Sequence, residues 1–446
     1  MKTTTILLVI ILITNLYPQG GWIEQSSGVT VQLTSVSCLG IYDINAWICG
    51  YSGTVLRTTN RGVNWLNVSG NGIPATVSLT NIIGFDANTA LTTGNISSNT
   101  YVYRTTNGGS NWVQVFFQAG GFINAIGLIS NNHFFMEGNP VGGRWSLWKS
   151  TNLGANWDST GLYLPQAGNE TGWNNAMFCY YGDKIWIGTN NTGLYYSSNR
   201  GSNWVIQPTF PEINSFALYF KQMSLDGYLG GATMLFTSNG GLNWSPKSAP
   251  GTGNFGGITG HSYFGDHTYY VRSDNKIYYN SNGGNFTIDY TAPTGNYRHV
   301  SGSLVYGPFW AIRDNGGITF HDYFGGINRI GSEIPGEFSL HQNYPNPFNP
   351  ATKIKFDVAS VSRFRGNDNI VLKIFDIMGR EIAVLINEQL QPGTYEVEWD
   401  GSNYTSGVYF INMRTDAFYE PTGSKNRGSA SLSTGYSETK KMVLIK

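Results

Sequence analysis

The sequence has few charged residues and few cysteines. Asp, Glu, Lys and Arg make up only 12% of its 446 residues, and the 27 basic and 27 acidic residues cancel. Nucleic-acid binding calls for a basic face and anionic membranes attract polybasic patches, so this composition argues against both partners. Three cysteines, Cys38, Cys49 and Cys179, are too few for a disulfide framework. Cys38 and Cys49 fall on neighbouring expected strands, and pairing and burial as free thiols both remain open.

Long hydrophobic runs and helical periodicity are also scarce. The one apolar run, Ile6–Leu16, follows Met1-Lys2 and is too short for a spanning helix. It has the form of a signal peptide, with cleavage expected near Gln19, although a buried strand is the alternative. We therefore expect residues 1–19 to be removed on export, and the mature chain to hold no transmembrane segment.

Motifs for metal or phosphate chemistry are missing. The six histidines form neither H-x-x-x-H nor H-E-x-x-H. Asp274-Asn275-Lys276 lacks the remainder of a calcium loop, and no glycine-rich phosphate loop opens a helix. The sequence therefore predicts no metal and no cofactor.

One short pattern, hydroxyl-x-Asn-x-Gly-x-Asn-Trp, occurs five times at intervals of roughly 45 residues, the spacing of a four-stranded propeller blade. Its defining residues are Asn60, Gly62 and Trp65; Asn107, Gly109 and Trp112; Asn152, Gly154 and Trp157; Asn199, Gly201 and Trp204; and Asn239, Gly241 and Trp244. We refer to each copy as a box.

Each box is interpreted as a tight turn between two strands. The Asn side chain is expected to bond the backbone two residues on, the hydroxyl to add a second local bond, and Gly to supply a positive φ. The Trp then opens the next strand and packs against the neighbouring sheet. The alternative is a repeated ligand site, but a motif that recurs once per blade favours a role in folding.

The ends of the repeat region set the expected number of blades. A sixth, decayed box covers Asn280–Phe286, and Gly20-Gly21-Trp22 resembles the tail of another. Strands are expected at 303–313 and 318–324, and the strand at Trp22 would complete their sheet. These features predict an all-β, seven-bladed propeller over 20–331, with six blades as the alternative.

The boxes resemble the Asp-box (BNR) repeat, with Asn in place of the usual Asp. Proteins with this repeat include sialidases, sortilin-type receptors, xyloglucanases and photosystem II assembly-factor-like propellers. Residues 136–157 most resemble secreted bacterial members of the last group. The resemblance covers about 20–330 and implies a fold more than an activity.

A second domain is expected after a linker at 332–337. Its segment 338–358 contains three closely spaced prolines followed by an alternating strand, and the later strands predict a small immunoglobulin-like β-sandwich over 338–446. Two polar segments, Ser362–Asn369 and Asp416–Thr439, are expected to be loop insertions.

This domain resembles the C-terminal sorting domain of type IX secretion cargo, type A. The residues that carry the resemblance are Tyr344, Pro345, Asn346, Pro347, Phe348, Asn349, Pro350, Gly379, Arg380, Gly407 and Tyr409. It implies that residues 338–446 interact with the type IX machinery and its sortase. The protein would cross the periplasm and become secreted or displayed on the cell surface.

Catalytic constellations known on related propellers are not complete in this sequence. A sialidase needs an arginine cluster with a Tyr–Glu pair, and Arg144, Arg272 and Arg313 lack such partners. Xyloglucanases of this type use two propellers and a pair of aspartates, whereas Asp86, Asp183, Asp226 and Asp266 recur at expected turns and favour turn closure. Glu137 is the one acid that merits a catalytic test.

We therefore expect the propeller to be a non-enzymatic module that binds a glycan or a surface protein. A glycoside hydrolase or lyase, and a purely structural surface protein, are the alternatives. Ligands would meet the loops between second and third strands, which carry Tyr51, Asn95, Arg144, Asn190, Asn191, Asp274, Asn275 and Arg313.

Overall fold

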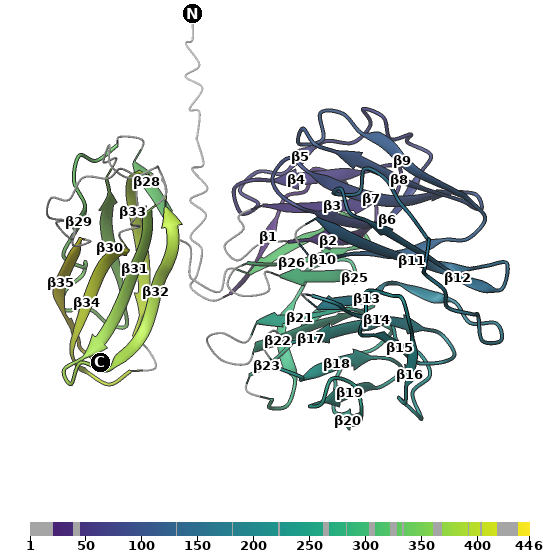
Figure 1. Cartoon of the computed structure of the whole chain (residues 1–446). Coiled ribbons are helices and arrows are strands. Elements are labelled where there is room, and N and C mark those ends of the chain that lie inside the picture. The colour runs from purple at the N-terminus through teal and green to yellow at the C-terminus, as the bar shows by residue number, and fades with distance from the viewer. Residues whose placement is uncertain are drawn as a thin grey trace, which may run out of the picture. The chain divides into compact units, whose positions relative to one another are not determined.

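The computed structural model describes most of the chain. The described residues are 21–38, 45–130, 132–180, 182–221, 224–261, 267–281, 283–302, 308–321, 328–331, 334–359, 368–390, 392–401, 404–416 and 436–446. They contain strands and turns and no helix. The chain divides between Tyr323 and Phe324 into two compact units (Figure 1).

The N-terminal unit holds seven antiparallel sheets in its described residues. Their strands are β1 (Trp22–Gln25), β2 (Leu33–Ser37), β3 (Ala46–Gly50), β4 (Val55–Thr58), β5 (Leu66–Asn67), β6 (Ser78–Gly84), β7 (Ala90–Ile96), β8 (Asn99–Thr105), β9 (Val113–Ala119), β10 (Ile123–Ser130), β11 (His133–Val141), β12 (Arg144–Ser150), β13 (Gly172–Tyr180), β14 (Lys184–Thr189), β15 (Leu194–Ser197), β16 (Val205–Gln207), β17 (Ala217–Phe220), β18 (Gly227–Gly230), β19 (Met234–Thr237), β20 (Ser245–Lys247), β21 (Phe255–His261), β22 (His267–Arg272), β23 (Lys276–Ser281), β24 (Thr287–Thr291), β25 (Tyr297–Gly302), β26 (Phe309–Arg313) and β27 (Ile318–His321).

These sheets are arranged as the blades of a propeller. Their first strands contact one another in the cyclic order β2, β6, β10, β13, β17, β21 and β25, and β25 contacts β2 again. Six of the sheets have four strands, while β10-β11-β12 has three, extended by an isolated bridge between Lys149 and Asp158. The prediction of an all-β propeller is confirmed.

The N-terminal strand closes the ring, as the position of Trp22 led us to expect. Strand β1 pairs with β27, with Trp22 opposite His321 and Gln25 opposite Ile318, so the last sheet combines both ends of the unit. The Trp22 indole donates to Asp289 Oδ2 at 2.7 Å and packs edge-on against Tyr269 of the preceding sheet. Side-chain and backbone contacts thus both hold the two ends together.

The boxes form the turns between third and fourth strands, but their hydrogen bonds reach further than expected. In the first box Asn60 Oδ1 accepts from the backbone N–H of Asn64 at 3.0 Å, four residues on rather than two. Thr58 Oγ1 likewise accepts from the N–H of Gly62 at 2.8 Å. The other four boxes repeat both bonds at 2.9–3.0 Å. Each box therefore closes two overlapping turns by itself.

The box glycines have two reasons to lack a side chain. All five have φ between 74° and 89°, as predicted. A Cβ at each would also collide with the preceding sheet, whose obstructing residues are Gln25, Val68, Leu91, Phe135 and Gln207. In the decayed sixth box, Phe286 is buried in the position of the Trp, whereas Asn282 lies outside the described residues.

Cys38, Cys49 and Cys179 form no disulfide within the described residues. Cys49 is fully buried, and burial raises the pKa of its thiol to about 12. Of the two readings that the sequence left open, the unpaired one is correct.

The described residues of the C-terminal unit form two four-stranded sheets. One contains β28 (Asn328–Gly331), β33 (Gly393–Asp400), β30 (Ala351–Val358) and β29 (Ser339–Leu340); the other contains β32 (Glu381–Leu390), β31 (Asp368–Asp376), β34 (Gly407–Asp416) and β35 (Ser437–Leu444). Inward-facing side chains of both sheets, including Phe356, Leu372, Trp399 and Ile411, form one core.

Two segment boundaries differ from those read in the sequence. Strand β28 was assigned to the propeller but pairs with β33, so the structural division falls before the expected linker. Of the two expected loop insertions, Asp368–Asn369 begin β31, Asp416 ends β34 and Ser437–Thr439 begin β35, so these residues are strand; 362–367 and 417–435 lie outside the described residues. Extended pairing in the sheet outweighs the polar composition of these residues.

Candidate functional site

The loops between second and third strands hold most of the expected ligand-facing residues. Tyr51 is 43% exposed, and Arg144 and Asn191 are also exposed. Asn190 is half-buried, and its Oδ1 accepts from the N–H of Thr171 at 2.8 Å, so it fixes the start of β13.

Other members of the expected set are also engaged within the fold. Asn95 lies in β7, where its Oδ1 accepts from Thr100 Oγ1 at 3.4 Å. Asp274 accepts from Tyr278 Oη and the Thr252 N–H, while Asn275 Nδ2 donates to Ala292 O at 3.1 Å. Polar residues at a loop are therefore not by themselves free to bind a ligand.

Arg313 is not a loop residue that faces a ligand. It ends β26, is 2% exposed, and forms an ion pair with Glu24 of β1. Its Nη1 donates to Thr294 O at 2.9 Å, and its guanidinium lies over the Tyr297 ring. The prediction for Arg313 is wrong because Glu24, distant in sequence, draws the guanidinium into the ring-closing sheet.

Aspartates at the turns between first and second strands make local contacts. Asp86 accepts from the N–H groups of Asn88 and Thr89, both at 2.6 Å, which closes its turn. Asp183 pairs with Arg200 at 2.5 Å, and Asp226 with Lys221 at 3.3 Å. Asp266 lies outside the described residues.

Glu137 is fully buried in β11. Its Oε2 accepts weakly from Asn124 Nδ2 at 3.4 Å, and its Oε1 has no hydrogen-bond partner among the residues that the structure describes. Burial raises the pKa of this carboxyl to about 8. A protonated, enclosed carboxyl of this kind has the pKa of a general acid but does not line either of the two cavities described below.

A buried carboxylate that sequence analysis missed organises the loops at one end of the ring. Glu170 accepts from Trp145 Nε1 at 2.8 Å, from Tyr195 Oη at 3.0 Å and from the N–H of Ala167 at 2.8 Å. Thr192 donates to its other oxygen. The carboxylate therefore joins its own loop to strands β12 and β15 and to the loop that contains Thr192, and no local pattern in the sequence indicates this role.

Exposed aromatic side chains lie on the linkers that enter this end of the ring. Phe210 is 89% exposed in a turn closed by the Glu212 N–H and Thr209 O at 2.9 Å, and Tyr163 is 61% exposed. The backbone joins these linkers to the loops between second and third strands: Gly193 N–H donates to Ile213 O at 3.1 Å, and Arg144 bridges Pro165. Both aromatic side chains are therefore accessible to a partner at this end of the ring.

The first strands enclose a cavity of about 400 Å³ along the ring axis. Asn175 crosses the cavity: its Oδ1 accepts from Ser35 Oγ at 3.0 Å and from Asn81 Nδ2, and its Nδ2 donates to Thr34 O at 3.4 Å. His299 also lines it, and its Nδ1 accepts from the N–H of Val36 at 3.2 Å. Burial lowers the pKa of His299 to about 4, so the ring is neutral at physiological pH.

No group of three or more His, Cys, Asp or Glu side chains in the described ranges is arranged to hold a metal ion. No helix in the same ranges has the length and apolar character needed to span a membrane.

In the C-terminal unit, the proline-rich motif is tied to the last strand. Phe348 is buried against Trp399, and its backbone bonds Val443 and Ile445 at 2.9 and 3.0 Å. Asn346 Oδ1 accepts from the N–H of Val443 at 2.9 Å. The other motif residues, Tyr344, Pro345, Pro347, Asn349 and Pro350, are exposed. One buried ring thus anchors an exposed, proline-stiffened segment to β35.

The remaining motif residues support turns around the same core. Asp376 Oδ1 accepts from the N–H groups of Met378 and Arg380, and Gly379 has a φ of 76°. Arg380 Nε lies 2.7 Å from Asp376 Oδ2. Gly407 opens β34, and Tyr409, buried against Trp399, donates to Thr405 O at 2.7 Å.

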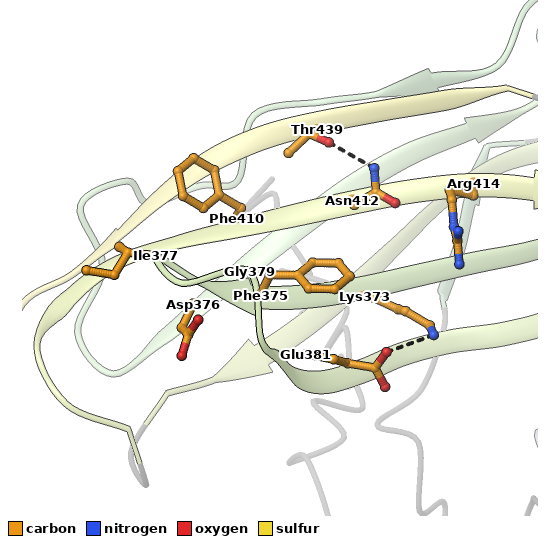
Figure 2. Close-up of a pocket in the computed structure, with 10 residues that line it drawn as sticks. All are labelled: Lys373, Phe375, Asp376, Ile377, Gly379, Glu381, Phe410, Asn412, Arg414 and Thr439. Atoms are coloured by element: carbon orange, nitrogen blue, oxygen red, sulfur yellow. Dashed lines mark hydrogen bonds and ion pairs between the residues drawn. The ribbon is translucent and has the colours of Figure 1, made fainter.

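A groove of about 540 Å³ lies on the outer face of the sheet β32-β31-β34-β35 (Figure 2). Its lining residues are Lys373, Phe375, Asp376, Ile377, Gly379, Glu381, Phe410, Asn412, Arg414 and Thr439. We call it the Phe375–Phe410 groove, after two residues that are direct partners on β31 and β34. No local pattern in the sequence indicates this groove, because its lining residues come from four strands.

Comparison with known proteins assigns the C-terminal unit. Residues 342–420 match the family model of secretion system C-terminal sorting domains. The match covers the proline-rich motif, β30 to β34 and the turn at Gly379.

The propeller is similar in structure to YCF48. A structure of YCF48 bound to D1 peptide has a TM-score of 0.54 with 13% sequence identity, covering 69% of this chain and 98% of that one. YCF48 from Cyanidioschyzon merolae has a TM-score of 0.53 at 12% identity, covering 68% and 99%. At this identity the likeness shows the fold.

A curated relative is also similar over a short range. A probable oligoxyloglucan-reducing end-specific xyloglucanase from Neosartorya fischeri is 28% identical over 137 residues, which are 28% of this chain and 15% of the enzyme. The chain thus spans a small part of that relative. Taken together, the similarities assign the C-terminal unit to export by the type IX secretion system, to the cell surface or the medium, and show that the N-terminal unit is a β-propeller.

Proposed function

We propose that this protein is a type IX secretion cargo whose propeller acts outside the cell as a non-enzymatic binding module. In this proposal residues 1–19 are a signal peptide, and residues 338–446 are recognised by the secretion machinery and its sortase. The observation that carries the export function is the sorting-domain match, on a β-sandwich in which Phe348 and Asn346 join the motif to β35.

Truncation tests the export function. Cells that express the chain without residues 338–446 should retain a folded propeller in the periplasm, while the full chain reaches the exterior. Fractionation followed by mass analysis would measure location and both trimmed ends. Normal export of the truncated chain would refute the role of the sorting domain.

The contacts and exposure of the polar side chains in the propeller support binding rather than catalysis. Glu170, Arg313 and Glu24 are committed to internal contacts, and Glu137 is enclosed. The exposed set instead comprises Phe210, Tyr163, Tyr51 and Arg144. Aromatic rings and Arg suit a protein segment or a glycan. The D1 peptide in the YCF48 structure shows that a propeller of this fold can carry a peptide.

The binding function has a direct test. Purified protein should bind a component of outer-membrane extracts or a polysaccharide panel, and Phe210→Ser with Tyr163→Ser should weaken binding at least tenfold. Phe117→Ser is the matched control, because Phe117 is 49% exposed on the outer strand β9. Equal loss in both variants, or no binding to either panel, would contradict the proposal.

Glycoside hydrolysis is the second candidate, favoured by the similarity to a xyloglucanase. Turnover of xyloglucan or sialosides that disappears in Glu137→Gln would establish it in place of the binding module. If the protein neither binds nor turns over these compounds, a purely structural role at the surface is the remaining proposal.

A further inference from the structure

The two sheets of the sorting domain differ in their outer faces. On β30 and β33 the outward side chains are charged and paired: Lys353 lies 2.9 Å from Glu396, and Thr394 donates to Asp357 at 2.6 Å. On β31 and β34 the side chains that point away from the core include Lys373, Phe375, Phe410 and Asn412, because Ile370, Leu372, Ile374 and Ile411 face the core. The outer face of β30 and β33 is thus a hydrated surface of paired polar groups, whereas the outer face of β31 and β34 carries the rings of Phe375 and Phe410 among polar side chains.

The charged groups around the Phe375–Phe410 groove are neutralised except for one. Lys373 pairs with Glu381 at 2.8 Å, and Asn412 Nδ2 donates to Thr439 Oγ1 at 2.8 Å (Figure 2). Asp376 pairs with Arg380. Arg414 is exposed beside Val371 and, within the described parts of the chain, makes no hydrogen bond or ion pair. The groove therefore carries one available positive charge at an apolar floor.

The turn at one end of the groove extends the apolar surface. Ile377 and Met378 are 69% and 75% exposed, although Asp376 and Arg380 hold the turn in one conformation. Because the turn is already fixed, its backbone loses little conformational entropy when a partner covers these side chains. With a volume of about 540 Å³, the groove is large enough for a few side chains of a partner.

We propose that the Phe375–Phe410 groove is the surface through which the sorting domain docks on the secretion machinery. Its partner is a protein segment that places apolar side chains over Phe375 and Phe410 and a carboxylate against Arg414. This inference rests on the export function proposed above and adds the face and the chemistry of recognition. Arg414 sets the acidic character of the partner because a bidentate Arg–carboxylate pair is strong and directional.

Charge reversal provides the test, in cells that carry a type IX system and express the full chain. Arg414→Glu should lower the exported fraction at least tenfold, with the protein accumulating in the periplasm. Lys355→Glu is the matched control, since Lys355 is likewise exposed on the outer face of the opposite sheet, and it should be exported as the wild type is. Both purified variants should unfold at the wild-type temperature.

A second variant, Phe375→Ser with Phe410→Ser, should give the same retention; if it fails to fold, Arg414→Glu decides. Normal export of Arg414→Glu, while the chain lacking 338–446 is retained, would overturn the docking surface and leave the export function intact. Equal retention of Lys355→Glu and Arg414→Glu would also overturn it. Loss of polysaccharide binding by Arg414→Glu with unchanged export would identify the groove as a glycan site instead.

Discussion

Gln25 hydrogen-bonds Trp65 across the point where the ring of sheets closes. The Gln25 Oε1 accepts from Trp65 Nε1 at 3.0 Å and from Trp310 Nε1 at 3.1 Å, and Nε2 donates to Arg61 O at 2.7 Å. Gln25 belongs to the last sheet through β1, whereas Trp65 belongs to the first box. One side-chain amide thus connects the beginning and the end of the propeller.

Replacing Gln25 should weaken ring closure. Gln25→Ala removes three hydrogen bonds and leaves two indole N–H groups without their acceptor, so we expect a loss of about 2–4 kcal/mol in the free energy of unfolding. Denaturant unfolding followed by tryptophan fluorescence would measure it. Gln114→Ala, at an exposed position on β9, is the control and should change stability by less than about 0.5 kcal/mol. Equal stability of the two variants would contradict a closing role for Gln25.

The box glycines should be more sensitive than other glycines of similar backbone geometry. At Gly154 (φ 74°) a Cβ would lie 2.5 Å from Leu91 Cδ1, whereas at Gly142 (φ 63°) it would meet open space. Gly142→Ala should therefore cost only the left-handed strain of about 1–2 kcal/mol, and Gly154→Ala about 1–3 kcal/mol more from overpacking. Thermal unfolding of the two variants would test this ranking, and an equal cost would refute the packing argument.

His299 should make the propeller less stable in acid. Its pKa is lowered from 6.5 to about 4 in the folded chain, so between these values the unfolded chain binds more protons, and stability falls as the pH drops. The shift corresponds to at most about 3 kcal/mol, and we expect less because the ring faces a cavity and is only partly covered. The difference in unfolding free energy between wild type and His299→Gln, measured from pH 7 to pH 4, isolates this contribution. A constant difference would show that the imidazole does not titrate in this range.

Glu137 should make the propeller less stable as the pH rises, the opposite of the effect of His299. Its pKa is raised from 4.5 to about 8, so the folded chain binds more protons than the unfolded chain between these values, and stability falls as the pH rises. Glu137→Gln should remove this dependence. The unfolding free energy of the variant, relative to that of the wild type, should therefore rise by roughly 3 kcal/mol between pH 4.5 and pH 7. Glu337→Gln, at an exposed position, is the control. Destabilisation of Glu137→Gln at pH 7 would show that the ionised carboxylate has a partner in solution.

Local sequence was sufficient for the boxes because their contacts are local. Asn60 and Thr58 bond groups within four residues, so the same pattern produces the same turn wherever it recurs. The prediction that the Asn side chain bonds the backbone two residues on was wrong, since the bond spans four residues. Residue types alone do not distinguish one turn from two overlapping turns. The strands between boxes followed from their alternation of apolar and turn residues.

The site residues depended on distant partners. Arg313 was expected in a loop because a charged side chain is common there. Its ion pair with Glu24, near the other end of the unit, instead holds it in the core. Glu170 accepts hydrogen bonds from Trp145, Tyr195 and Thr192, and no spacing in the sequence relates these four residues. Their roles appear only when the loops converge.

The sequence by itself determined the repeating turns, because their contacts lie within four residues. It also indicated the strand content, the two-unit organisation and the kinship of residues 342–420 with sorting domains, through alternating residues, shifts of composition and motifs. Tertiary structure alone decided the closure through Gln25, the burial of Glu137 and Arg313, and the groove that contains Arg414. These features arise from strand register and from the stacking of sheets, which bring together residues that no local pattern links.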